Sequence, residues 1–184
     1  TRISRRQFTK AAALAIPAFT VLPSRVFGAN ERLNIAAVGI GNMGKGNIRA
    51  CAGENIVALC DVASGYAAPV FNAYPNAARY TDYRVMLEKQ KDIDAVIVAT
   101  PDHTHAVIAM AALQSGLHVF CQKPLAHTVD ETRKLTEAAR ASNVQTQMGN
   151  QGHSAEGIRL VREWIQSGAI GDVKEVHAWT DRPD

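Results

Sequence analysis

Residues 33–44 read LNIAAVGIGNMG, an apolar run that leads without a break into a glycine-rich turn. The run Leu33 to Val38 has the Val, Ile and Ala content of a strand that is buried on both faces. The turn has the spacing Gly-x-Gly-x-x-Gly, with its glycines at Gly39, Gly41 and Gly44. A strand followed by such a turn and then by a helix is typical of the first unit of a doubly wound α/β sheet.

Each glycine of the turn has a physical role. Gly39 permits the sharp turn, Gly41 lets the main chain approach a pyrophosphate, and Gly44 lets the helix pack close to the strand. The helix that follows presents unpaired N–H groups and the positive end of its dipole to the anion. We therefore predict a dinucleotide site in which the whole turn takes part. Its predicted residues are Gly39, Ile40, Gly41, Asn42, Met43 and Gly44.

Residues 39–45 also match Gly-x-x-x-x-Gly-Lys, the start of the loop that binds nucleoside triphosphates. That loop requires Ser or Thr after the Lys to hold magnesium, whereas this chain has Gly46. The sequence therefore favours a dinucleotide over a nucleoside triphosphate.

Asp61 ends the second apolar run and follows Gly39 by 22 residues, near the distance at which an acid reaches the adenosine ribose. A carboxylate there accepts hydrogen bonds from a 2′-hydroxyl and repels a 2′-phosphate, and residues 62–65 supply no Arg to offset it. We predict NAD as the cofactor. NADP is the alternative, because Ser64 or a base from elsewhere could accept the extra phosphate.

The rest of the chain alternates short apolar runs with longer helical stretches, which predicts the α/β class: a Rossmann, doubly wound parallel sheet over residues 30–150. Residues 151–184 are expected to start a truncated α+β second domain, with a helix ending at Gly168 and a strand at 173–180. The predicted strands of the sheet are 33–38, 56–60, 95–99, 118–121 and 144–148. The predicted helices are 66–74, 83–88, 105–115 and one that begins with a capping box at 128–131.

The first 29 residues differ in charge from the rest of the chain. They hold five of the 20 basic residues and no acid, which leaves 15 bases against 17 acids, a net charge of −2, from residue 30 onward. Arg5 and Arg6 precede a small, apolar run from Ala11 to Val21, so we predict a twin-arginine signal peptide over residues 1–29. The alternative is a basic arm on the protein body. A signal of this kind implies folding in the cytoplasm, recognition by the twin-arginine export machinery and a periplasmic location.

The slightly acidic body has no basic stripe, so nucleic acid is not an expected partner. Three cysteines with no zinc-type spacing predict free buried thiols. His103, His105 and His153 form the one conceivable metal set, but no acidic or Cys residue is spaced to complete it. We therefore predict no metal site.

Three further segments fall where strands of this sheet would end: TPDHTH at 100–105, CQKP at 121–124 and GNQGH at 149–153. With the glycine turn and Asp61 they resemble the Gfo/Idh/MocA oxidoreductase family, from about Leu33 to the end of the chain. The leader resembles the exported branch of that family that is similar to glucose-fructose oxidoreductase.

The resemblance implies roles for five residues. Thr100, Pro101 and His105 would line the cofactor, and Gln122 stands where the family usually has Glu, so it would keep a hydrogen bond to a ribose hydroxyl without the charge. Lys123 is the expected catalytic residue, donating to a substrate hydroxyl or carbonyl. The acid/base His usual in the family would lie downstream of this chain.

The function predicted is an NAD(P)-dependent oxidoreductase that transfers a hydride to or from a sugar, polyol or similar hydroxyl compound. Two alternatives remain: an NAD-dependent glycoside hydrolase that oxidises its sugar transiently, and a dinucleotide-binding protein without turnover. The resemblance also implies a homo-oligomer formed through the second domain.

Overall fold

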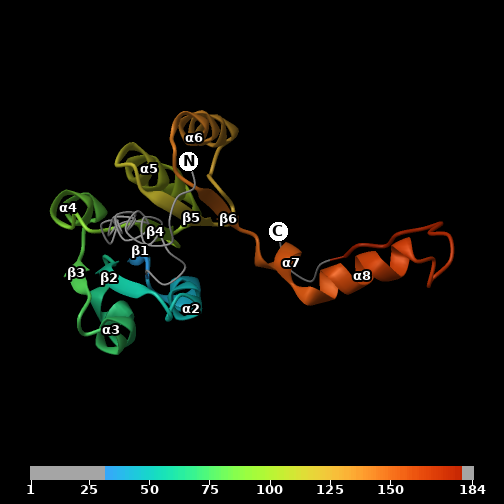
Figure 1. Ribbon diagram of the computed structural model, residues 1–184, viewed down its shortest axis with the longest axis horizontal. Coiled ribbons are helices and arrows are strands. Elements are labelled where there is room, and N and C mark those ends of the chain that lie inside the picture. The colour runs from blue at the N-terminus through green and yellow to red at the C-terminus, as the bar shows by residue number, and fades with distance from the viewer. Residues whose placement is uncertain (1–31, 180–184) are drawn as a thin grey trace, which may run out of the picture. The chain divides into compact units, whose positions relative to one another are not determined.

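The structure is a computed structural model and describes residues 32–179. Within this range six parallel strands form one sheet, and helices cover both of its faces (Figure 1). The α/β, doubly wound fold class predicted from the sequence is confirmed. The predicted leader at 1–29 lies outside the described residues.

The strand order is β3-β2-β1-β4-β5-β6. The chain moves outward from β1 to β3 and then returns to place β4 on the other side of β1, so the order reverses between β1 and β4. The carboxyl ends of these two strands border the crevice in which doubly wound sheets bind ligands. The strands are β1 (Asn34–Val38), β2 (Asn55–Cys60), β3 (Ala78–Tyr80), β4 (Ala95–Val98), β5 (His118–Gln122) and β6 (Thr146–Gly149).

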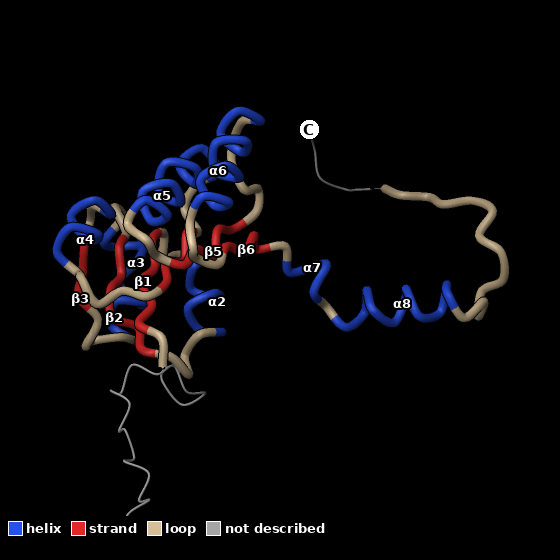
Figure 2. Tube along the Cα trace, turned by 45° about the horizontal axis from the view of Figure 1, so that its top comes forward, coloured by secondary structure: helices blue, strands red, loops and turns tan. Residues whose placement is uncertain are grey.

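Both faces of the sheet are buried, which explains why its central strands are apolar throughout. Ile35 and Ala37 of β1 belong to a core cluster with α2 and α3, whereas Ala36 and Val38 belong to a second cluster with α4, α5 and α6. Figure 2 shows the strands in red as one layer of neighbouring segments. The helices of this sheet are α2 (Asn42–Ala50), α3 (Ser64–Ala73), α4 (Tyr83–Lys89), α5 (Asp102–Gln114) and α6 (Val129–Ala141).

All five predicted strands are present, and the sheet has a sixth, β3, that the sequence analysis missed. β3 is three residues long, and it lies at the edge of the sheet beside β2. Its sequence is Ala-Arg-Tyr, and none of the three residues is fully buried. Because a short edge strand needs no apolar run, periodicity gave no signal for it.

The predicted helices are also present. The capping box of α6 is complete: the Glu131 N–H donates to Thr128 Oγ1 at 3.2 Å, and the Thr128 N–H donates to Glu131 Oε2 at 2.9 Å. α5 is followed by Gly116 at φ 73°, a left-handed conformation that suits a glycine after a helix. No helix within residues 32–179 is long and apolar enough to cross a membrane.

Beyond the sheet, α7 (Gln151–Ser154) and α8 (Glu156–Gln166) follow, and α8 ends shortly before Gly168, as predicted. The strand predicted at 173–180 is wrong for the described residues 173–179, which form no regular structure. These residues are exposed, and no neighbouring strand pairs with them there. An alternating sequence forms a strand only where a partner strand receives its hydrogen bonds.

We predict that Gly44→Ala destabilises the fold, whereas Gly46→Ala in the same helix does not. A Cβ at Gly44 would overlap the carbonyl oxygen of Gly39, but a Cβ at Gly46 would meet nothing within 4 Å. The free energy of unfolding should fall by about 2 kcal/mol for Gly44→Ala and rise by up to about 1 kcal/mol for Gly46→Ala. Urea denaturation followed by circular dichroism measures both. Equal stability of the two variants would contradict the close packing of α2 on β1.

Candidate functional site

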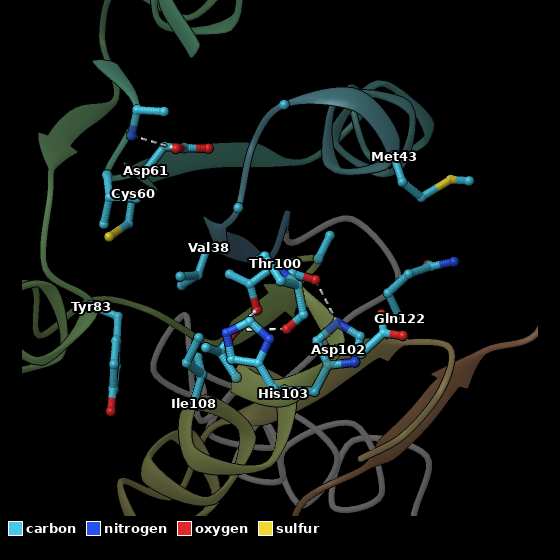
Figure 3. Close-up of a pocket in the computed structure, with 18 of the residues that line it drawn as sticks. Val38, Met43, Cys60, Asp61, Tyr83, Thr100, Asp102, His103, Ile108 and Gln122 are labelled. Atoms are coloured by element: carbon cyan, nitrogen blue, oxygen red, sulfur yellow. Dashed lines mark hydrogen bonds between the residues drawn. The ribbon is translucent and has the colours of Figure 1, made fainter. Parts of the chain in front are cut away.

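A cavity of about 870 Å³ opens at the carboxyl ends of the strands, where the sheet order reverses. It extends from Asp61, after β2, past the glycine turn to Gln122 and Lys123, at the end of β5. Figure 3 shows this arrangement, with Asp61 and Tyr83 toward one side of the view and Gln122 and Met43 toward the other. The cavity therefore spans several strand ends and has two chemically different ends.

The glycine turn forms the middle of the cavity wall. Gly39 has a φ of 77°, and a Cβ there would lie 2.7 Å from the backbone of Ala99 and Thr100. Its N–H donates to the Cys60 carbonyl at 2.9 Å. The turn is therefore packed between the ends of β2 and β4, and Gly39 is the residue that permits this close approach.

The amino end of α2 faces the cavity, and the first turn of this helix contains no acidic side chain. Gly41 is its N-cap and makes no side-chain capping bond. Asn42 follows at φ 37°, a left-handed conformation that Asn tolerates better than most residues. The uncapped N–H groups and the helix dipole suit an anion such as a diphosphate.

The ring of Tyr66, from α3, lies against Gly41, and any Cβ at position 41 would overlap it. Tyr66 is 66% exposed, so its side chain can rotate without disturbing the core. A ligand that approaches the Gly41 main chain meets this ring at the edge of the turn. The ring therefore covers the approach to the Gly41 main chain and has to move aside for a ligand to bind there.

Asp61 points toward the glycine turn. Its Oδ2 accepts the Ile40 N–H at 2.9 Å, and its Oδ1 accepts the Ala63 N–H, also at 2.9 Å. A carboxylate oxygen accepts more than one hydrogen bond, so both oxygens keep capacity for a ribose hydroxyl. Asp61 thus joins the turn to the end of β2 and presents its charge to the cavity.

Gln122 is only 5% exposed, and its amide belongs to a polar network. Its Oε1 accepts from Asn47 Nδ2 at 3.2 Å and from Gln151 Nε2 at 3.0 Å, while its Nε2 donates to the Gly149 carbonyl at 3.3 Å. A carboxylate at this position would meet the Gly149 carbonyl with no proton to donate. The neutral amide therefore fits its surroundings better than Glu would.

Lys123 follows directly and is exposed. Among the residues that the structure describes, its ammonium group makes no hydrogen bond and no ion pair. It lines the cavity at the end opposite to Asp61. An unengaged ammonium at this position is suited to bind an oxygen of a second ligand.

His105 is 1% exposed and bridges two connections of the sheet. Its Nδ1 lies 2.6 Å from the Pro124 carbonyl oxygen and its Nε2 lies 2.8 Å from that of Thr100. Both ring nitrogens are therefore engaged by the main chain. His105 forms part of the cavity wall and positions the loops that carry Thr100 and Lys123.

Most of the predicted site residues are brought together in this one cavity, but two do not line it. Ile40 is fully buried in the core, and only its N–H takes part, through Asp61. Gly44 is covered by the Gly39 carbonyl and acts by allowing close packing. Those that line the cavity are Gly39, Gly41, Asn42, Met43, Asp61, Thr100, Pro101, His105, Gln122 and Lys123.

One wall of the cavity was not predicted as part of the site: the connection between β3 and α4, together with the first residues of α4. Thr81, Asp82, Tyr83 and Arg84 all line the cavity. Because β3 was not predicted, nothing placed this connection beside Asp61. The available signal was Asp82, which caps α4 by accepting the Arg84 N–H at 2.9 Å.

Cys60 lines the cavity, and its thiol is not activated. Burial, reinforced by the charges of Asp82 and Asp61, raises the pKa of Cys60 to about 12, so its thiol stays protonated at neutral pH. Cys60 and Cys121 are free and buried, as predicted, whereas Cys51 is only half-buried. No group of three or more potential metal ligands occurs within residues 32–179.

Comparison with known proteins gives three kinds of similarity. Residues 33–150 match the model of the oxidoreductase family with an NAD-binding Rossmann fold (GFO_IDH_MocA). Inositol 2-dehydrogenase from Salmonella paratyphi B is 33% identical over 151 residues, which are 79% of this chain and 45% of that protein. The chain therefore spans less than half the length of this curated relative.

Two solved structures share the fold. Myo-inositol 2-dehydrogenase from Lactobacillus plantarum has a TM-score of 0.72 at 26% identity, and the match covers 78% of this chain and 43% of that one. The WlbA dehydrogenase from Bordetella pertussis, solved with NADH and UDP-GlcNAcA, has a TM-score of 0.69 at 25% identity, with coverage of 77% and 42%.

We predict that Gly41→Glu weakens NAD binding by about 100-fold or more, because it places a carboxylate where the diphosphate would lie. Gly46→Glu is the matched control: it adds the same charge to α2 at an exposed position outside the cavity. Isothermal titration calorimetry on the full-length protein measures both affinities. Unchanged NAD affinity in Gly41→Glu would show that the turn does not bind the diphosphate.

Proposed function

This chain belongs to the Gfo/Idh/MocA oxidoreductase family, and we propose that the whole protein transfers a hydride between NAD and a hydroxyl-bearing carbon of a sugar or polyol. The observation that carries the proposal is the single cavity that connects Asp61, the glycine turn and Lys123. A dinucleotide has two nucleoside halves joined by a diphosphate. The cavity offers a matching series of groups: a carboxylate, an uncapped helix end and an ammonium.

The residues present fit NAD in one orientation. Asp61 would accept hydrogen bonds from the adenosine ribose, and the amino end of α2 would hold the diphosphate. The nicotinamide half would then extend toward Gln122 and Lys123. When bound, NAD supplies the carbon that accepts or donates the hydride.

Lys123 is the residue of this chain that we place at the reaction centre. Its ammonium would donate a hydrogen bond to the substrate oxygen and stabilise the negative charge that develops there as the hydride moves. His105 holds the Pro124 carbonyl, so it positions the segment that carries Lys123. The packed loops therefore hold the backbone of Lys123 at the end of the cavity where the nicotinamide would lie.

The relatives support the substrate class. The curated relative and one solved structure are inositol dehydrogenases, and the other solved structure holds a nucleotide sugar. Both kinds of compound carry several hydroxyl groups. We extend only this shared feature, a polyhydroxylated ring, to the substrate of this protein.

We predict that the full-length protein given NAD and myo-inositol, or another polyhydroxylated ring, forms NADH in equal amount to the oxidised product. Lys123→Met should lower kcat by about 100-fold, a usual loss for a residue that assists proton transfer, with little change in NAD affinity. Lys134→Met is the control, because Lys134 is exposed on α6 and outside the cavity. Absorbance at 340 nm measures the rate.

Two other results would contradict the proposed reaction, and a third would contradict the role of Lys123. Release of an aglycone from a glycoside without net NADH would identify the NAD-dependent glycoside hydrolase instead. NAD binding without turnover of any hydroxyl compound would identify a dinucleotide-binding protein that is not an enzyme. Unchanged turnover in Lys123→Met would remove Lys123 from the reaction centre.

We also propose that the protein is exported to the periplasm through the twin-arginine machinery and assembles as a homo-oligomer through its downstream domain. The support for export is the sequence of residues 1–29, and the support for assembly is the family resemblance.

We predict that replacing both Arg5 and Arg6 by Lys blocks export. The Lys pair keeps the charge of the segment, but the export receptor reads the arginines themselves. Cell fractionation of the full-length protein measures the periplasmic share. An unchanged periplasmic share would contradict the proposed twin-arginine signal and would favour the alternative, a basic arm on the protein body.

A further inference from the structure

The connection between β3 and α4 places a charged pair beside Asp61. The Asp61 N–H donates to the Tyr80 carbonyl at 3.1 Å, so the end of β3 lies directly next to Asp61. Asp82 and Arg84 line the same cavity as Asp61.

Arg84 is held by Asp82. The Arg84 Nη2 donates to Asp82 Oδ2 at 2.7 Å, and its Nε donates to Asp82 Oδ1 at 3.0 Å. The guanidinium carbon lies 5.7 Å from the centre of the Tyr83 ring. The hydrogen bond from Arg84 lowers the pKa of Asp82, so Asp82 is a carboxylate at neutral pH.

The Asp82–Arg84 pair affects whether the Asp61 end of the cavity accepts a ribose 2′-hydroxyl or a 2′-phosphate. Asp61, Asp82 and Arg84 together carry one net negative charge. A ribose 2′-hydroxyl is neutral and donates to a carboxylate, whereas a 2′-phosphate is repelled by both carboxylates. The planar guanidinium that would bind such a phosphate is already occupied by Asp82.

The pair is also easy to open. The Arg84 side chain is 75% exposed and that of Asp82 is 35% exposed, so solvent screens their attraction. The Arg84 side chain is therefore held by the charge of Asp82 and not by packing against other side chains. Removing that charge would leave its guanidinium beside the ribose end of the cavity.

We propose that Asp82 sets the preference of this protein for NAD over NADP by holding Arg84, and that the adenosine end of the cavity contains a latent binding site for a 2′-phosphate. This inference rests on the proposed function, because it requires NAD to occupy the cavity with its adenosine at Asp61. Asp82, which precedes α4, would then influence the choice between NAD and NADP in addition to Asp61, which follows β2.

The variant Asp82→Asn tests the proposal without breaking α4. Asp82 caps α4 through Oδ1, and Asn is an equally good N-cap residue, so only the charge is lost. Glu88→Gln is the matched control, because Glu88 is an exposed acid of the same helix outside the cavity. The double variant Asp82→Asn with Arg84→Gln removes the proposed phosphate ligand as well.

Isothermal titration calorimetry on the full-length protein with NAD and with NADP gives the ratio of the two dissociation constants. We predict that Asp82→Asn shifts this ratio toward NADP by about tenfold, the effect of removing about one close charge–charge repulsion and freeing one guanidinium. The double variant should return to within about threefold of the wild-type ratio, and Glu88→Gln should not change it.

The outcomes separate this inference from the function it rests on. If the wild-type protein binds NAD but the ratio does not move in Asp82→Asn, or if the gain persists without Arg84, the latent site is wrong and the proposed function stands. If the wild-type protein binds neither dinucleotide, the proposed function and the inference both fail. Circular dichroism of each variant confirms that the helices are retained.

Discussion

The architecture of this chain depends on how closely helix α2 approaches the end of strand β1. The carbonyl oxygen of Gly39 lies where a Cβ of residue 44 would be, so only glycine allows the helix to begin at this distance. Gly39 in turn packs against the backbone of Ala99 and Thr100. These contacts bring the amino end of α2 to the point where the strand order reverses, and every group of the cavity is arranged around that point.

The two buried faces of the sheet hold this arrangement in place. β1 lies between β2 and β4 and contributes small side chains, such as Ala36 and Ala37, to both core clusters. Because helices cover both faces, a ligand reaches the strands only at their ends. The cavity at the carboxyl ends is therefore lined by residues from five strand-to-helix connections, and His105 contacts two of them through its ring nitrogens.

Local patterns predicted the parts of the fold that depend on local sequence. The glycine spacing, the apolar strands and the α6 capping box each have a cause within a few residues, and they were found. The edge strand β3 depends on the neighbour that tertiary folding gives it, and it was missed. The Asp82–Arg84 pair is a local contact, two residues apart, but its place beside the cavity depends on β3 and was missed with it. The need for a neighbouring strand also explains the strand wrongly predicted at 173–180, since alternation was present but, within residues 173–179, no partner strand was. The hydrogen-bond network of Gln122 joins side chains far apart in the chain, so local sequence patterns could not predict it either.

A crystal structure of the full-length protein with NAD tests the central claim most directly. We predict that the diphosphate lies within hydrogen-bonding distance of the main-chain N–H groups at the start of α2, with the adenosine ribose on Asp61 and the Tyr66 ring moved aside from Gly41. A diphosphate bound elsewhere, with Tyr66 still against Gly41 and no ribose contact to Asp61, would contradict it.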